Sequence, residues 1–489
     1  MKKLILSFFA VALCMNLTAL YAENIGVPAE CEDVMLQTFY WDSYKDQSGN
    51  DSKYGRTKWI DLMKDSVAIR ENFDLVWFPP SAYGDGGNGN GGVGYTHKQL
   101  SKQDCDWGTK KTLVKLIAAL HRGGTRVLAD IVINHRGNMS NWCNFFQDDF
   151  GAYGKFQLTQ KHICRSDEGF TNSQSSCYGA STTERGAADS GTNFDGARDL
   201  DHTNEYVQSW AKAYVQWMLN VMGYDGFRYD MTLGYHGRYL KMYNEAAQPY
   251  ISVSECWESI ARQKQHLQEC EYNTMVFDFQ QKYELKKAII DGSYGKLKKN
   301  PNSFRGQGLE KYAVTFVDNH DTFDRGTTYG DNQFGSSDLT TATAKSRLLQ
   351  AYAYLMAMPG VPCVFWPHWK SYQEEINQLI AIRKQAGIHS ESKVLEETSG
   401  QYKYSATVQG HRGKVVVRVG KNRDMEAPEG FTQVANGDHY TVYLKEEAQG
   451  IEDVQGDNVR GTKAEKFVEN GRLYIRLGEN VFDATGRVL

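Results

Sequence analysis

Residues 204–230 have the sequence NEYVQSWAKAYVQWMLNVMGYDGFRYD, an amphipathic segment followed by a short apolar one. In the first part the apolar side chains recur at helical spacing, which predicts a helix over Asn204–Met222. The members of this stripe are Tyr206, Val207, Trp210, Tyr214, Trp217, Met218 and Val221. The run Gly226–Asp230 that follows predicts a strand buried on both faces. A helix followed by a buried strand is the repeating unit of a parallel α/β fold.

The same alternation continues on both sides of this stretch. Strand-like runs separated by helical patterns lie at Val34–Trp41, Leu75–Phe78, Arg126–Ile133, Gly226–Asp230, Ile251–Glu255, Met275–Phe279, Ala313–Asp318 and Val361–Trp366. Eight alternations in about 340 residues predict an α/β fold of the (β/α)8 TIM-barrel type.

Two stretches depart from the alternation and predict further domains. Residues 137–198 follow the third strand and are rich in Gly, Ser, Asn and Asp, which predicts an inserted loop domain. Residues 387–489 contain short alternating runs, which predict a C-terminal antiparallel β-sandwich domain. The barrel would then comprise residues 23–136 and 199–386. The glycine-rich stretch Gly84–Gly94 fits either a loop at the barrel rim or a plain surface linker.

The amino terminus has the features of a signal peptide. Two lysines precede an apolar run, and small residues near position 22 offer a cleavage site, so residues 1–22 predict export. Cys14 as a lipid acceptor is the alternative. No later run reaches the ~18 apolar residues of a membrane span. We therefore expect a secreted, periplasmic or cell-surface protein without a membrane span, and a monomer.

Composition narrows the class of protein further. Hydrophobic residues make up 41% of the chain and charged residues 23%, which is typical of a globular protein. The net charge of −4 argues against nucleic acid as a partner. All cysteines except Cys14 would remain after export and could form disulfides, whose pairing stays open. Their spacing shows no zinc motif, so no structural zinc site is expected.

Polar residues gather where four of the predicted strands end, which is where barrel enzymes place their catalytic groups. Arg228 and Asp230 are two apart on one strand and face the same way. An adjacent guanidinium favours the ionised carboxylate that nucleophilic attack needs. Glu255 ends the neighbouring strand, about 4.8 Å away. This spacing predicts the ~5–5.5 Å carboxyl separation of retaining glycosidases.

Three more residues at strand ends complete the predicted site. Asp321 would add negative charge where an oxocarbenium-like positive charge develops. His135 and His320 could donate hydrogen bonds to sugar hydroxyls. Each residue taken singly also fits a capped strand end, a structural ion pair or a core histidine.

These motifs resemble those of the α-amylase family of retaining glycoside hydrolases, family thirteen. The resemblance runs from about Val34 to Trp369. It rests on Asp130–His135, Asp199–Asp201, Gly226–Asp230, Glu255 with Trp257, and Phe316–Asp321, with supporting segments at Gly94-Tyr95, Gly108-Thr109 and Gly360–Phe365.

The resemblance implies a role for each residue. Asp230 would be the nucleophile, Glu255 the general acid and then base, and Asp321 the transition-state stabiliser. Arg228 would position Asp230. The substrate-binding residues would be His135, His320 and Tyr95, with Tyr95 stacking on the sugar.

The resemblance also implies a calcium ion. Asn134 and Asp199 match family calcium ligands, together with a backbone carbonyl near Gly234, and oxygen donors suit Ca²⁺. The alternative is that Asp199 only caps the helix beginning near Thr203.

Two features depart from the family. Leu233 and Gly234 stand where a cation often contacts the leaving-group sugar, and Pro367 leaves His368 without its usual acidic neighbour.

The leading hypothesis is an exported hydrolase of internal α-1,4-glucosidic bonds in starch, glycogen or maltooligosaccharides, acting with retention. A glucanotransferase or a short-oligosaccharide α-glucosidase would use the same residues. A non-catalytic glycan-binding protein is the alternative from another class, and the presence of all three carboxylates argues against it.

Overall fold

The computed structural model describes residues 25–45, 54–84, 93–137, 139, 142–173, 175, 177–178, 181–298, 300–323, 333–334, 337–447, 465–469, 472–477 and 480–483. The predicted signal peptide and most of Gly84–Gly94 lie outside these residues. Two units are distinguished, residues 1–447 and 448–489. The predicted fold class is confirmed, because the first unit contains a closed parallel barrel and a C-terminal antiparallel sheet.

All eight predicted runs supply the strands of the barrel. They are β1 (Met35–Gln37), β2 (Leu75–Trp77), β5 (Arg126–Ile131), β10 (Gly226–Tyr229), β11 (Ser252–Ser254), β12 (Met275–Phe277), β13 (Ala313–Phe316) and β14 (Val361–Phe365). The barrel closes in the order β1-β14-β13-β12-β11-β10-β5-β2. Nearly every strand residue is buried, as the continuous apolar runs predict.

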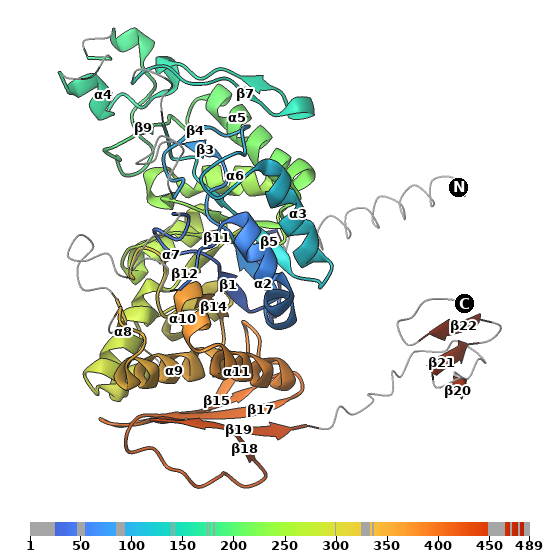
Figure 1. Cartoon of the computed structure of the whole chain (residues 1–489). Coiled ribbons are helices and arrows are strands. Elements are labelled where there is room, and N and C mark those ends of the chain that lie inside the picture. The colour runs from blue at the N-terminus through green and yellow to red at the C-terminus, as the bar shows by residue number, and fades with distance from the viewer. Residues whose placement is uncertain are drawn as a thin grey trace, which may run out of the picture. The chain divides into compact units, whose positions relative to one another are not determined.

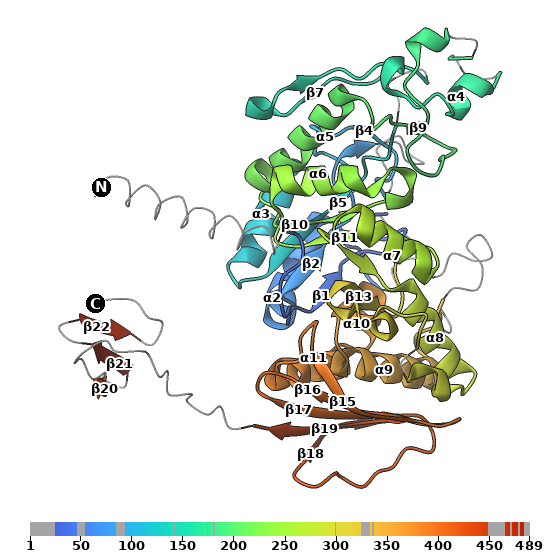
Figure 2. The same ribbon diagram turned by 180° about the vertical axis from the view of Figure 1, so that it is seen from behind.

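Helices surround the barrel (Figures 1 and 2). They include α2 (Trp59–Asn72), α3 (Lys110–His121), α5 (Glu205–Trp217), α6 (Gly237–Ala247), α7 (Ile260–Glu269), α8 (Phe279–Ile290), α9 (Ala342–Ala357), α10 (Trp366–Ser371) and α11 (Gln373–Ala386). The predicted helix over 204–222 is present as α5 and a π-helical turn, Met218–Met222, that continues it. Its N-cap is Asn204, whose side chain accepts a hydrogen bond from the amide of Tyr206, so Asp199 is not the cap of this helix.

The segment after the third barrel strand has little regular structure. Among its described residues it holds only short elements. They are β7 (Asp148–Asp149), β8 (Lys155–Phe156), α4 (Glu168–Thr171) and 3-10 turns at Gly151–Tyr153, Gln160–His162 and Thr182–Glu184. At its two ends, β6 (His135–Arg136) pairs with β9 (Arg198–Asp199), which returns the chain to the barrel.

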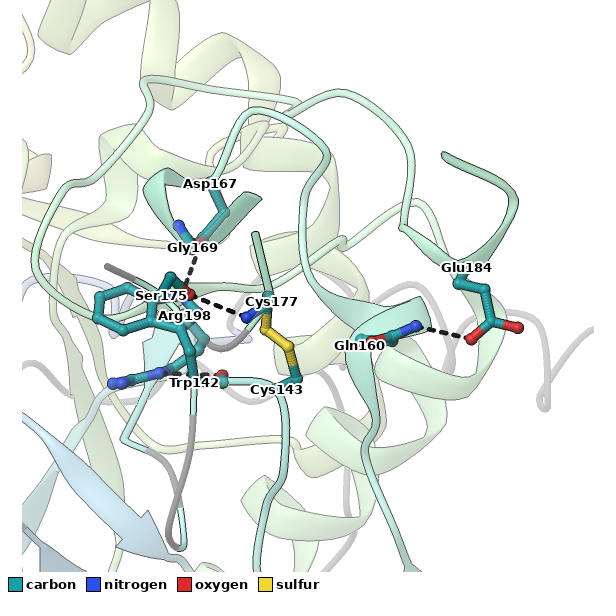
Figure 3. The surroundings of a disulfide bond; sticks show 9 residues. All are labelled: Trp142, Cys143, Gln160, Asp167, Gly169, Ser175, Cys177, Glu184 and Arg198. Atoms are coloured by element: carbon teal, nitrogen blue, oxygen red, sulfur yellow. Dashed lines mark hydrogen bonds between the residues drawn. A yellow bond between two sulfur atoms is a disulfide. The ribbon is translucent and has the colours of Figure 1, made fainter. Parts of the chain in front are cut away.

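A disulfide and an aromatic contact stabilise this segment (Figure 3). Cys143 and Cys177 are bonded, with their Cα atoms 5.9 Å apart. Next to the disulfide, the Arg198 guanidinium lies 3.7 Å from the ring centroid of Trp142. The Trp142 indole in turn donates a hydrogen bond of 2.6 Å to Asp167. These contacts give a loop-rich segment a fixed structure that its short elements alone would not provide.

The antiparallel sheet follows α11. Its strand order is β15 (Lys393–Ser399), β16 (Tyr404–Gln409), β17 (Gly413–Val419), β19 (Tyr440–Glu446) and β18 (Thr432–Gly437). It lies along α9 and α11, at the opposite end of this unit from α4 (Figures 1 and 2). The second unit contains one three-stranded sheet, β20 (Glu465–Glu469), β21 (Arg472–Leu477) and β22 (Asn480–Asp483).

Candidate active site

Three neighbouring strands bring the central carboxylates together. In β5 and β10, Asp130 lies beside Arg228 in register. In β10 and β11, Tyr229 lies beside Ser254, so the next residues, Asp230 and Glu255, emerge side by side at the strand ends. The parallel register therefore produces the pairing that the sequence predicts.

One guanidinium holds these three carboxylates. Arg228 Nη1 lies 2.9 Å from Asp130 Oδ1 and 2.7 Å from Asp230 Oδ1, while Nη2 lies 3.1 Å from Glu255 Oε1. The backbone amide of Met231, in a left-handed conformation with φ 46°, donates a hydrogen bond of 3.0 Å to Glu255 Oε2. Such charge-assisted contacts fix the orientation of the carboxylates.

Burial affects the pKa values of Asp230 and Glu255 more than the neighbouring Arg228 does. Burial raises the pKa of Asp230 to about 6, against the opposing effect of Arg228. Burial likewise raises the pKa of Glu255 to about 7, again against Arg228 and with a further increase from Asp230. Burial thus raises the pKa of both carboxyl groups, which favours retention of a proton within the pair near neutral pH, as acid–nucleophile pairs need.

A second network links Tyr95, His320 and Asp130. The Tyr95 hydroxyl lies 2.9 Å from Asp130 Oδ2 and 2.7 Å from His320 Nε2. His320 Nε2 is also 3.1 Å from Asp321 Oδ2, and Gln37 contacts the other ring nitrogen at 2.9 Å. The Tyr95 and His320 rings stack with centroids 5.2 Å apart. Asp321 is thereby placed in the same site as Asp230 and Glu255.

His135 also lines the cavity, although both of its ring nitrogens have protein partners, and its Nδ1 lies 3.4 Å from Asn134 Nδ2. Its Nε2 lies 2.8 Å from the carbonyl oxygen of Tyr95, and burial lowers its pKa to about 4. The neutral ring stacks on Phe194, with centroids 4.2 Å apart. His135 therefore forms part of the wall, with Nε2 oriented toward protein rather than toward a ligand.

His368 has a carboxylate neighbour despite Pro367. Its Nε2 lies 3.7 Å from Asp318 Oδ2, and its Nδ1 is 2.9 Å from the Tyr352 hydroxyl. The buried Lys282 ammonium lies 3.2 Å from the same Asp318 carboxylate. The acid comes from the strand end that also carries Asp321, so this network supports that end of the site.

These groups open into a cavity of about 440 Å³. Its lining residues are Trp41, Tyr95, Thr96, His135, Phe194, Asp230, Met231, Leu233, Glu255, Trp257, His320 and Asp321. Sequence reasoning did not assign Trp41, Phe194 or Trp257 to the lining. An aromatic in a loop carries no periodic signal, although the position of Trp257 two residues after Glu255 was a usable hint. A carboxylate cluster with aromatic walls can hold and cleave a sugar chain.

The residues implied as calcium ligands also lie together. The side-chain oxygens Asn134 Oδ1, Asp199 Oδ1 and Asp189 Oδ2 are buried and have no hydrogen-bond partner among the described residues. A Cβ on Gly234 would clash with Asn134 Oδ1, so this backbone closely approaches the amide. Burial, then the neighbouring Asp189, raise the pKa of Asp199 to about 10. Unpartnered oxygens and two adjacent carboxyl groups fit a bound hard cation. Asp189, in the inserted segment, was missed by sequence reasoning.

Comparison with known proteins identifies the family of the chain. A sequence profile described as the catalytic domain of alpha amylase matches residues 73–368, more than half of the chain. The chain belongs to the α-amylase family. It is therefore an amylase-family glycoside hydrolase, the class that acts on starch-type glucans.

Individual relatives of this α-amylase family member span most of its length. Probable alpha-amylase 2 of Arabidopsis thaliana is 28% identical over 440 residues, covering 84% of this chain and 94% of that protein. Glucan 1,4-alpha-maltotetraohydrolase of Roseateles saccharophilus is 26% identical over 439 residues, covering 83% and 70%. The crystal structure of α-amylase from Geobacillus thermoleovorans superposes with a TM-score of 0.59 at 14% identity, covering 86% and 99%, which shows a shared fold. Among the described residues no helix combines the length and apolarity that crossing a bilayer requires.

Proposed function

We propose that the protein is an exported, monomeric enzyme that hydrolyses internal α-1,4-glucosidic bonds of starch-type glucans with retention of configuration. The observation that carries the proposal is the position of Asp230 and Glu255 on adjacent nitrogens of one guanidinium, at 2.7 and 3.1 Å. Two carboxyl groups that share one guanidinium lie close together, which favours double displacement over attack by an intervening water.

In the first step Asp230 attacks the anomeric carbon and forms a glycosyl ester, while Glu255 gives its proton to the departing glycosidic oxygen. In the second step Glu255, now ionised, takes a proton from water, whose oxygen displaces Asp230 and regenerates both groups. Asp321 stabilises the positive charge that develops in both transition states. Arg228 positions Asp230.

Substrate contacts come from the cavity wall. Tyr95 and Trp41 have nearly parallel rings, 10° apart, and present flat faces of the kind on which sugar rings stack. His320 and His135 line the same subsite. Leu233 lies where a cation would contact the leaving-group sugar, so that side of the cavity is apolar. The names of the relatives, an α-amylase and a glucan 1,4-alpha-maltotetraohydrolase, support an α-1,4-glucan as substrate.

A glucanotransferase is the second candidate, because a sugar hydroxyl can replace water in the second step. The apolar Leu233 favours it, since fewer polar groups then position an attacking water. Product analysis on maltotriose distinguishes the two. A hydrolase gives only shorter products, whereas a transferase also gives longer ones.

Calcium is proposed as a structural ion. Asn134, Asp189 and Asp199 would hold it through side-chain oxygens, with a backbone carbonyl near Gly234. The bound ion neutralises the adjacent carboxylates and links the inserted segment to the barrel. Export is supported by the Cys143–Cys177 disulfide, because such bonds persist in oxidising compartments.

The test is the anomer first released from an α-linked oligosaccharide, followed by proton NMR. Retention predicts the α-anomer before mutarotation, and prompt release of the β-anomer would overturn the nucleophile assignment. Asp230→Asn should reduce kcat by several powers of ten with an unchanged circular dichroism spectrum. As a matched control, Asp225→Asn changes an aspartate on the same chain segment that lies outside the cavity, and it should retain activity.

A further inference from the structure

The turn that carries His320 and Asp321 is built around Asp318, a carboxylate that the proposed mechanism does not use. Asp318 lies just beyond the end of β13, and its side chain is 1% exposed. Its oxygens accept hydrogen bonds from the Thr322 hydroxyl at 2.9 Å and from the Phe334 amide at 3.0 and 3.1 Å. Because Thr322 directly follows Asp321, this one carboxylate holds both ends of the turn.

Inside the turn, further hydrogen bonds fix the backbone of Asp321. The Thr322 hydroxyl, which donates to Asp318, accepts the Asn319 amide at 3.0 Å. The side-chain oxygen of Asn319 accepts the amides of Asp321 at 3.1 Å and of Thr322 at 2.9 Å. Hydrogen bonds connected in this way polarise one another and make the segment rigid. The position of the Asp321 side chain in the cavity therefore depends on a network that begins at Asp318.

The charge of Asp318 is compensated from the preceding unit of the barrel. Lys282 lies in α8, the helix that follows β12, and its ammonium is 3.2 Å from Asp318 Oδ1. Neither side chain exposes more than 1% of its surface. Lysine and aspartate are almost never buried so completely unless they are paired. His368 also faces this carboxylate, at 3.7 Å, but burial lowers its pKa to about 4. Its ring is thus neutral near neutral pH, where Lys282 supplies a full positive charge to Asp318.

We propose that Lys282 is a positioning residue for catalysis, because its ammonium stabilises the Asp318 carboxylate that holds Asp321 in place. The inference rests on the proposed function, in which Asp321 stabilises the transition state. Removing the cation would leave a buried carboxylate without its counter-charge, which is strongly unfavourable. The carboxylate would then bind a proton or turn toward water, and in both cases its contacts with Thr322 and Phe334 would change. Small displacements of a catalytic group are enough to slow a reaction considerably.

The experiment replaces Lys282 by Met, which keeps most of the length of the side chain and removes its charge. Kinetics are measured on a maltooligosaccharide with a chromogenic leaving group, and circular dichroism checks the fold. We expect kcat to fall roughly 10- to 100-fold. KM should change less than about threefold, because Asp321 acts on charge that develops only in the transition state. Lys384→Met is the matched control. It breaks another Lys–Asp pair, with Asp74 at 2.8 Å, outside the cavity, and it should keep the native kcat.

A double variant separates positioning from simple destabilisation. In Lys282→Met/Asp318→Asn neither charge remains, and the new amide keeps an oxygen that can accept from Thr322. Replacing both partners of a buried ion pair is tolerated far better than removing one of them. The double variant should therefore have a kcat at least about fivefold above that of Lys282→Met. A residue with only a structural role would lower the free energy of unfolding and leave the kcat of the folded protein unchanged.

A folded Lys282→Met protein with native kcat would overturn the inference and leave the proposed function standing, as would a double variant no faster than the single one. A native protein that cleaves no α-glucan would instead overturn the proposed function, and this inference with it. Should Lys282→Met not fold, Thr322→Val decides, because it removes the hydroxyl between Asp318 and Asn319 and leaves both charges in place. It should lower kcat at least about tenfold, and native kcat in that variant would refute the positioning role.

Discussion

Replacing Arg228 by Gln should move the whole pH profile of the enzyme to higher pH. The guanidinium contacts Asp130, Asp230 and Glu255 at 2.9, 2.7 and 3.1 Å and is the positive charge that all three share. Glutamine keeps part of the side chain and removes the charge. Each carboxyl group then loses a contact that favours its ionised form, so each pKa rises.

The size of the change follows from the contacts. A hydrogen bond to a charged group contributes about 1.5–3 kcal/mol, and 1.36 kcal/mol corresponds to about one pKa unit. Loss of this contact should therefore raise the pKa of both Asp230 and Glu255 and move each limb of the pH profile upward by roughly 1–2 pH units. The proposed mechanism needs an ionised Asp230 and a protonated Glu255, so the optimum should move to higher pH by the same amount. On the acidic side of the optimum, where activity follows the ionised fraction of Asp230, kcat/KM should fall roughly 10- to 100-fold.

The assay is kcat/KM against pH on a maltooligosaccharide with a chromogenic leaving group, because this ratio reports the groups of the free enzyme. Arg228→Lys keeps a charge without the fork and should give a smaller change in the same direction. Arg305→Gln is the control. It breaks a similar pair, with Glu397 at 2.6 Å, outside the cavity. If Arg228→Gln folds and both limbs of its pH profile stay at the native positions, the Arg228 charge does not control the pKa values of Asp230 and Glu255.

Two further predictions concern the inserted segment. Asp189→Asn should weaken Ca²⁺ binding at least tenfold and abolish the rise in Tm that Ca²⁺ gives through mass action. Calorimetric titration checks this, and an unchanged affinity would remove Asp189 from the site. Cys143→Ser should lower the free energy of unfolding by about 3–4 kcal/mol, because the disulfide closes a loop with a sequence separation of 34 residues. Urea denaturation measures the loss, and a stability equal to that of the native protein under oxidising conditions would contradict it.

The barrel was predictable because its signal is local. Each strand is a short apolar run. Because both faces of the sheet are buried, polar and apolar residues do not alternate along the strand, and the run is continuous. The runs were longer than the strands, as at Val34–Trp41, where only Met35–Gln37 forms β1. The surplus residues form the strand ends and loops that carry the site. Parallel register then brings Asp230 and Glu255 together, since both follow directly after paired residues.

The inserted segment was not predictable in the same way. Its contacts join residues far apart in sequence through loops, which have no periodicity. The partner of Cys143 stayed open among several cysteines, and only the fold selects Cys177. Asp189 lies among other acidic and polar residues with no feature that marks it. Phe194 stacks on His135 only because β9 returns the chain beside β6.

The electrostatics of the site show where pairwise reasoning from sequence stops. Arg228 and Asp230 are two residues apart on one strand. From this spacing the sequence predicts that the arginine keeps the Asp230 carboxylate ionised. In the structure Arg228 contacts three carboxylates that are buried or nearly buried. Asp321, which lines the active-site cavity, is a fourth acid nearby. One positive charge cannot compensate all of them, so burial prevails and the pKa values of Asp230 and Glu255 rise. In the proposed mechanism this excess of acid has two uses. It would keep a proton on Glu255 for the leaving group, and it would leave unbalanced negative charge to stabilise a cationic transition state.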